Sequence, residues 1–178
     1  MSDLNHIDKI CKDLNIKNYT ITSWNAIDVN GDINLHGDAL SELPLQFNVI
    51  YGNFYCSGNK LTTLKGCPKS VGDGFDCGGN NLTSLEGSPE SVGGHFNCQF
   101  NNLIDLKGSP KSIGGGFYCH TNPIGSIFDK VDIDFIRTFK TFKIIKDGVI
   151  DLKRLKYLMS MFDLPIDLKD IKKYYTIK

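Results

Sequence analysis

The chain has 178 residues, no net formal charge and 40% hydrophobic residues, which is enough to bury a sizeable core in one domain. No stretch approaches the roughly 18 consecutive apolar residues of a membrane span, and the first residues lack the apolar core of a signal peptide. We therefore expect a soluble protein of the cytoplasm, in which the six cysteines are reduced thiols.

The first thirty residues are predicted to form an N-terminal cap. Ser2 and Asp3 can cap a helix that runs to about Leu14, with its apolar residues on one stripe. Residues 19–22 are typical of a strand and residues 26–29 of its antiparallel partner. We expect this segment, residues 1–30, to cover the apolar end of the units that follow.

A repeat with a period of 21 residues occupies positions 31–127. In register, residues 53–61, 74–82, 95–103 and 116–124 read NFYCSGNKL, GFDCGGNNL, HFNCQFNNL and GFYCHTNPI. A weaker first copy, DINLHGDAL, begins at Asp32 and has Asp38 in place of the repeated Asn. Between copies the chain reads LKGCP, LEGSP and LKGSP. A fixed period of this length predicts stacked supersecondary units rather than one globular core.

This pattern resembles the leucine-rich repeat, in which an L-x-L-x-x-N-x-L stretch forms one strand of a parallel sheet. Here Phe and Cys occupy the two strand Leu positions. The short unit with Pro on the return path is similar to the bacterial subclass of the family. Residues 81–89, NLTSLEGSP, are similar to small leucine-rich-repeat proteins of large-genome bacteriophages. The resemblance implies an α/β, β-rich solenoid with a curved parallel sheet of about five strands, closed at both ends by helical or hairpin caps.

Stacking of the copies predicts which side chains are buried. Strand alternation sends the repeated Phe and Cys residues inward, and copies about 4.8 Å apart align them into columns. The return path carries Pro68, Pro89 and Pro110, and is expected to be extended or made of tight turns. A buried asparagine ladder is expected to satisfy backbone groups of its own turn and of the adjacent turn. Its members are Asn59, Asn80, Asn101 and Asn122.

The repeated cysteines raise the question of a metal site. A zinc site needs ligand pairs that converge on one point, whereas these cysteines are spread along a column. We interpret them as small core residues, and we expect no metal and no cofactor. No Ser-His-Asp or Cys-His arrangement and no carboxylate pair stands out, so we expect no catalytic residues and no enzyme.

Residues 128–178 break the period and are predicted to form a C-terminal helical and hairpin cap or a small subdomain. Helices are expected at 132–139 and 152–162, with Asp151 as a cap, and a helical turn or two at 167–173. A hairpin is expected around Asp147, and a last strand near 174–177. Residues 129–178 hold 12 Lys and Arg against 8 Asp and Glu, a charge of +4, whereas the preceding residues hold 8 against 12, or −4. Solvated lysines on cap helices explain this split.

The solvent side of the repeat strands is the most informative surface. Its columns mix hydrogen-bonding residues with aromatic ones and contain almost no Lys or Arg, which is typical of protein recognition and unfavourable for nucleic acid. Phe100 stands out, because the other copies have Gly or Thr in its column. The residues predicted to bind a protein on this concave face are Tyr55, His95, Asn97, Gln99, Phe100, Tyr118 and His120.

The first functional hypothesis is therefore a non-enzymatic module, a monomer or weak oligomer, that binds another protein and has no small-molecule substrate or membrane partner. The resemblance to phage proteins implies action in the host cytoplasm, by inhibiting a host protein such as a defence enzyme or toxin. In the alternative hypothesis, the repeats are a targeting arm for a C-terminal effector that binds nucleic acid or carries an unrecognised activity. A third hypothesis is self-association along the solenoid edge.

Overall fold

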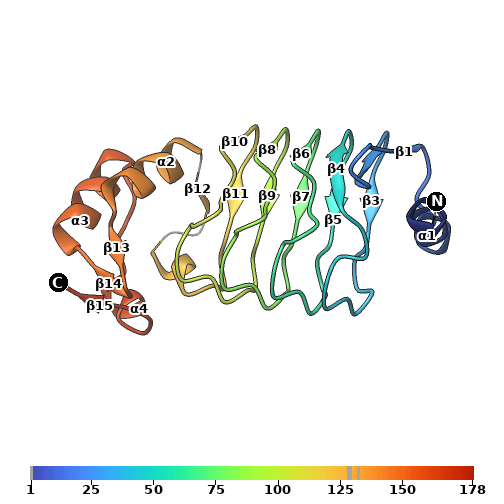
Figure 1. Cartoon of the computed structure of the whole chain (residues 1–178). Helices are drawn as coiled ribbons and strands as arrows, with labels where there is room; N and C mark the ends of the chain where they lie inside the picture. The colour runs from blue at the N-terminus through green and yellow to red at the C-terminus, as the bar shows by residue number, and fades with distance from the viewer. Residues whose placement is uncertain (1, 128–129, 132) are drawn as a thin grey trace.

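The computed structural model describes residues 2–127, 130–131 and 133–178 (Figure 1). Its centre is a solenoid of about four turns with two parallel sheets, closed by helices and short strands at both ends. Each turn takes 21 residues, so that Ile33 pairs with Phe54 and Phe54 with Phe75 in the next turn. Five aligned strands separated by 21 residues therefore correspond to four full turns, as the sequence period predicted.

The front sheet contains the repeated Phe residues. Its parallel strands are β3 (Ile33–Asn34), β5 (Phe54–Tyr55), β7 (Phe75–Asp76), β9 (Phe96–Asn97) and β11 (Phe117–Tyr118). Equivalent residues face each other in every pair, and backbone groups beyond the short strands continue the ladder, as in the bond from Cys56 N to Asp76 O, 2.8 Å long. The front sheet ends at β12 (Lys130–Val131), which pairs antiparallel with β11.

A second parallel sheet, the back sheet, lies on the return path. Its strands are β2 (Ile27–Val29), β4 (Phe47–Ile50), β6 (Ser70–Val71), β8 (Ser91–Val92) and β10 (Ser112–Ile113), with β1 (Tyr19–Ile21) antiparallel to β2. The sequence predicted an extended return path but not this regular sheet. The strands β6, β8 and β10 have only two residues each, one buried and one closer to solvent, which is too short for a visible alternation of apolar and polar residues.

Between the two sheets lies a core made of residue columns. The rings of Phe54, Phe75, Phe96 and Phe117 stack with centroids 5.1–5.7 Å apart. Beside them the four repeated cysteines are fully buried. Because every turn presents the same apolar residues to its neighbours, each turn completes the core of the next. Leu40, the first-copy equivalent of the buried Leu61 and Leu82, is only partly buried, because the first turn has a neighbouring repeat on one side only.

Close packing of successive turns requires glycine where the back strands end. A Cβ atom on Gly93 would lie 1.9 Å from the carbonyl oxygen of Gly72 in the preceding turn, and one on Gly114 would lie 1.9 Å from that of Gly93. No side chain fits at such a distance, so this glycine column sets how closely the turns approach.

The N-terminal end consists of α1 (Ser2–Asp13) and the β1–β2 hairpin, as predicted. Ile7 and Cys11 of α1 are buried in the common core. The Tyr19 hydroxyl donates a hydrogen bond of 2.7 Å to Asp8, which joins the hairpin to the helix. The first turn of the solenoid is thus covered by apolar residues of the helix.

The C-terminal segment follows a short 3-10 helix, η1 (Ile124–Ser126). Its helices are α2 (Ile133–Phe142), α3 (Leu152–Met161) and α4 (Leu168–Ile171), and its sheet contains β13 (Ile145–Lys146), β14 (Val149–Ile150) and β15 (Thr176–Ile177). Asp151 caps α3 by accepting from the backbone of Arg154, as predicted. The segment touches the last repeat through Tyr175, whose hydroxyl donates to Ile104 O at 2.8 Å.

Two details of the C-terminal prediction differ from the structure or lie outside it. The α2 helix continues to Phe142, three residues beyond the end of the helix expected at 132–139. The apolar spacing of Phe135, Phe139 and Phe142 suits a helix, and the first two are buried. The C-terminal segment was predicted to begin at Phe128 and its first helix at Asp132. Both of these residues lie outside the described residues.

Candidate functional site

All seven residues predicted to bind a partner lie on the solvent side of the front sheet, which we name the front face. Tyr55, Asn97 and Tyr118 are the second residues of β5, β9 and β11, and His95 directly precedes β9. Because Phe54 and its equivalents point into the core, strand alternation turns these neighbours outward. The front face is therefore built on the most regular part of the fold.

Five of the seven line one shallow hollow of about 340 Å³. They are Tyr55, His95, Asn97, Gln99 and Tyr118. The rings of His95 and Tyr118 meet edge to face, with centroids 5.6 Å apart. Nδ1 of His95 accepts a hydrogen bond of 2.7 Å from the backbone of Gly116, which identifies this nitrogen as the unprotonated one of the ring. The hollow thus has an aromatic wall that backbone contacts hold in place.

Sequence reasoning missed two further residues of this hollow, Asn53 and Asp76. Asp76 is the one carboxylate among the described residues that line it, and no Lys or Arg is among them. Its Oδ1 accepts from Gly78 N at 2.8 Å, a local turn that fixes the side chain. The signal was present in the sequence, because Asp76 is the only acidic residue in the column of Tyr55, Asn97 and Tyr118.

A second carboxylate lies at the edge of the front face. Oδ1 of Asp32 accepts hydrogen bonds from the backbone and side-chain nitrogens of Asn53, at 2.7 and 3.1 Å. The backbone bond, followed by the side-chain bond, lowers the pKa of Asp32, because both stabilise the charged form. The front face therefore carries negative charge at neutral pH.

The remaining two predicted residues, Phe100 and His120, lie outside the hollow and pair with each other, with ring centroids 5.4 Å apart. Phe100 has a φ of +52° and the residue is 57% exposed. Three of the equivalent residues, Gly37, Gly58 and Gly79, have φ between +62° and +73°, and the fourth, Thr121, has a φ of +54°. A left-handed backbone costs a residue with a Cβ about 1–2 kcal/mol. Phe100 is thus an exposed aromatic residue at a position where the fold favours glycine.

The asparagine ladder lies beneath the front face. The side-chain amide of Asn80 donates to Cys56 O of the preceding turn and Cys77 O of its own turn, both at 3.0 Å, and its oxygen accepts from Leu61 N at 3.0 Å. Equivalent bonds are made by Asn59, Asn101 and Asn122. All four side chains are buried, so the ladder holds the front loops at a constant spacing.

The six cysteines are free and buried. Burial, as the largest cause, raises the pKa of the Cys67, Cys77 and Cys98 thiols well above the ordinary value, which keeps them protonated. Among the described residues, no group of three or more His, Cys, Asp or Glu could hold a metal ion. No helix in the described ranges is both long and apolar enough to traverse a bilayer.

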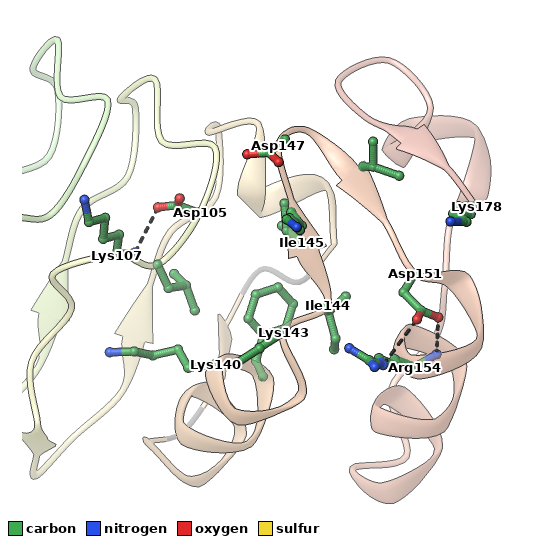
Figure 2. Close-up of a pocket in the computed structure, with 14 residues that line it drawn as sticks. Asp105, Lys107, Lys140, Lys143, Ile144, Ile145, Asp147, Asp151, Arg154 and Lys178 are labelled. Atoms are coloured by element: carbon green, nitrogen blue, oxygen red, sulfur yellow. Dashed lines mark hydrogen bonds and ion pairs between the residues drawn. The ribbon is translucent and has the colours of Figure 1, made fainter.

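A larger hollow that sequence reasoning did not find is the C-terminal cleft, of about 750 Å³, between the last repeat and the C-terminal segment (Figure 2). Its basic lining residues are Lys107, Lys140, Lys143, Lys146, Arg154 and Lys178. Its acidic ones are Asp105, Asp147 and Asp151. Residues 105–107 and 139–178 come together only through the packing of the segment on the solenoid, so no local sequence signal indicates the cleft.

The fold defines the chain as a solenoid protein of stacked 21-residue turns with Phe and Leu repeats, which is compatible with a leucine-rich-repeat-like architecture. In comparisons with known proteins, no family model, no curated protein and no solved structure matches the chain. Function must therefore be inferred from the surfaces themselves.

Proposed function

We propose that the chain is a non-enzymatic module whose front face binds another protein. The observation that carries the proposal is Phe100, because an exposed aromatic ring is kept there at a backbone position that favours glycine. Backbone strain of this kind is concentrated at functional sites. The aromatic side chains Tyr55 and Tyr118 of the same face, surrounded by hydrogen-bonding groups, add the residue types that anchor protein interfaces.

The charge of the hollow suggests which side chain the partner contributes. Asp76 lies among Tyr55, His95 and Tyr118 in the lining, and an aromatic ring next to a carboxylate is a favourable site for a cation. We infer that the partner inserts an arginine or lysine side chain into the hollow. A hollow of about 340 Å³ accommodates one such side chain rather than a folded element.

The resemblance of the repeats to small phage proteins extends the proposal. On that analogy, the partner is a host protein in the host cytoplasm, such as a defence enzyme or a toxin, and binding inhibits it. Inhibition would require only that the front face cover a functional surface of the partner. No residue of this chain needs to take part in a chemical step.

The experiment starts with capture of proteins from a bacterial lysate on the tagged chain and continues with the Kd of the purified partner. The Phe100→Gly/Tyr118→Ala variant should weaken binding by about 30-fold or more, because two aromatic anchors of the front face are lost. Trp24→Ala is the matched control, since Trp24 is 61% exposed and lies in the β1–β2 turn of the back sheet. It should leave the Kd within about twofold.

A second variant tests the inferred basic side chain. Asp76→Asn keeps the side-chain shape and the oxygen that accepts from Gly78, but removes the charge. Its Kd should rise by about tenfold and depend less on salt concentration. Full affinity of the folded Phe100→Gly/Tyr118→Ala protein would overturn the assignment of the front face. Full affinity of Asp76→Asn alone would overturn only the basic partner group.

A further inference from the structure

The C-terminal cleft has the dimensions of a small-molecule site and lies apart from the front face. Its volume of about 750 Å³ falls within the range of ligand pockets. Figure 2 shows its labelled residues arriving from the last repeat, from the end of α2, from the β13–β14 hairpin and from the start of α3. A ligand in the cleft would therefore touch both the solenoid and the C-terminal segment.

The cleft has an apolar floor. Leu106, Phe139 and Ile144 are buried beneath it, while Ile145 and Val149 are partly exposed in it. Partly exposed aliphatic side chains in a concave site offer a surface on which a flat or apolar group can be removed from water. This floor distinguishes the cleft from a purely polar surface groove.

Basic side chains outnumber acidic ones around the floor, six to three. Asp151 already pairs with Arg154 at 3.2 Å, and Asp105 accepts from the backbone of Lys107 at 2.9 Å. Among the described residues, the ammonium groups of Lys143, Lys146 and Lys178 make no ion pair or hydrogen bond, so they are available to a ligand.

Lys143 carries a further sign of function. It directly follows α2 and has a φ of +48°, a backbone conformation in which helices usually end on glycine. A lysine at this position is strained where a glycine would not be. Lys143 nevertheless lines the cleft. In Figure 2 its label stands between those of Lys140 and Ile144.

We propose that the C-terminal cleft binds a small molecule in which a phosphate group is joined to a planar or apolar body, as in a nucleotide. The unpaired lysines hold the phosphate as point charges, and the floor of Ile145 and Val149 receives the body. A long nucleic acid would instead need basic residues along an extended stripe, whereas these lie around one hollow. The site gives the C-terminal segment a role beyond covering the last repeat.

The test uses the full chain with pyrophosphate and ADP as probes, titrated by calorimetry and by chemical-shift changes in NMR spectra. ADP should bind more tightly than pyrophosphate, because only ADP occupies the floor. The Lys143→Gln/Lys146→Gln variant should weaken both by about tenfold or more. The control Lys153→Gln/Lys156→Gln removes the same charge from exposed residues of α3 outside the lining and should change neither affinity by more than about twofold.

Lys143→Gly excludes loss of binding through unfolding, because glycine suits the positive φ of this residue. It should be at least as stable as the unaltered chain in thermal unfolding, yet bind pyrophosphate several-fold more weakly. Absence of binding by both probes at millimolar concentration would overturn the proposal. So would equal weakening by the α3 control, or tighter binding of an oligothymidylate than of ADP, because either would indicate a general basic surface. An Ile145→Ala variant that binds ADP at full affinity would overturn the role of the floor.

Discussion

Replacement of Phe100 by glycine should leave the fold about as stable as before, while removing an exposed aromatic anchor of the front face. Phe100 has a φ of +52° and is 57% exposed as a residue, and its ring centroid lies 5.4 Å from that of His120. Glycine adopts this backbone conformation without steric cost. The prediction is unusual, because most substitutions that remove a large side chain destabilise a protein.

The magnitude follows from three terms. Release of the left-handed strain should contribute about 1–2 kcal/mol to the free energy of unfolding. The greater freedom of glycine in the unfolded chain subtracts about 0.4–1 kcal/mol, and loss of the exposed ring contact with His120 subtracts about 0.5 kcal/mol. The net change in the free energy of unfolding for Phe100→Gly is therefore between about −0.5 and +1 kcal/mol.

Phe100→Ala is the matched variant, because it also lacks the ring but keeps a Cβ atom and the strain. Phe100→Gly should exceed it in stability by about 1 kcal/mol, or about 2–4 °C in Tm for a chain of this size, measured by calorimetry. In the mirror experiment, Gly79→Ala should lose about 1 kcal/mol, because Gly79 has a φ of +62° in the same column. A Tm of Phe100→Gly below that of Phe100→Ala would refute the reasoning.

Three further predictions concern the stability of the stack. Asn80→Leu should lower the free energy of unfolding by about 3 kcal/mol, because it leaves buried backbone groups without a hydrogen-bond partner. The control Asn81→Leu, at an exposed position, should change the free energy of unfolding by less than about 0.5 kcal/mol. Equal urea midpoints of the two variants would contradict this prediction. Gly93→Ala should cost more than about 2 kcal/mol, because its Cβ would lie 1.9 Å from Gly72 O; an unchanged Tm would count against the close approach. Burial raises the pKa of the Cys98 thiol above its ordinary 9.0, so above that pH the unfolded chain releases a proton that the folded chain keeps. The free energy of unfolding should then fall by up to about 1.4 kcal/mol per pH unit for this thiol. Urea titrations at about pH 8 and pH 10 measure it, and an equal free energy of unfolding at both would contradict the argument.

Much of the fold could be predicted because the repeat places the same residues in the same environment several times. One Phe, one Cys and one Asn in every 21 residues indicate stacked strands with a buried ladder. The structure has Phe54 stacked on Phe75 and Asn80 bonded to two turns, because equal spacing along the chain becomes equal spacing along the stack. The end elements were also predictable, since their helices have apolar stripes and Asp151 is a recognisable cap.

The candidate site was predictable only in part. Strand alternation indicated which side chains face solvent, and hence Tyr55 and Tyr118. It did not indicate that Asp76 lies in the same hollow as these rings, or that Phe100 lies outside it. Those relations depend on how side chains from neighbouring turns lean toward one another, which is a property of the stacked sheet and not of any one repeat.

The order of residues along the chain was sufficient for the solenoid, its period and its inward columns, because these follow from local geometry repeated at a constant interval. Folding in three dimensions was needed for the back sheet, since two-residue strands such as Ser91–Val92 become a sheet only when their neighbours supply hydrogen bonds. The same holds for the C-terminal cleft, which brings Lys107 next to residues more than thirty positions away. Contacts between residues so far apart in the chain depend on how whole helices and strands pack. The residues that separate them show no periodic pattern that would predict this packing.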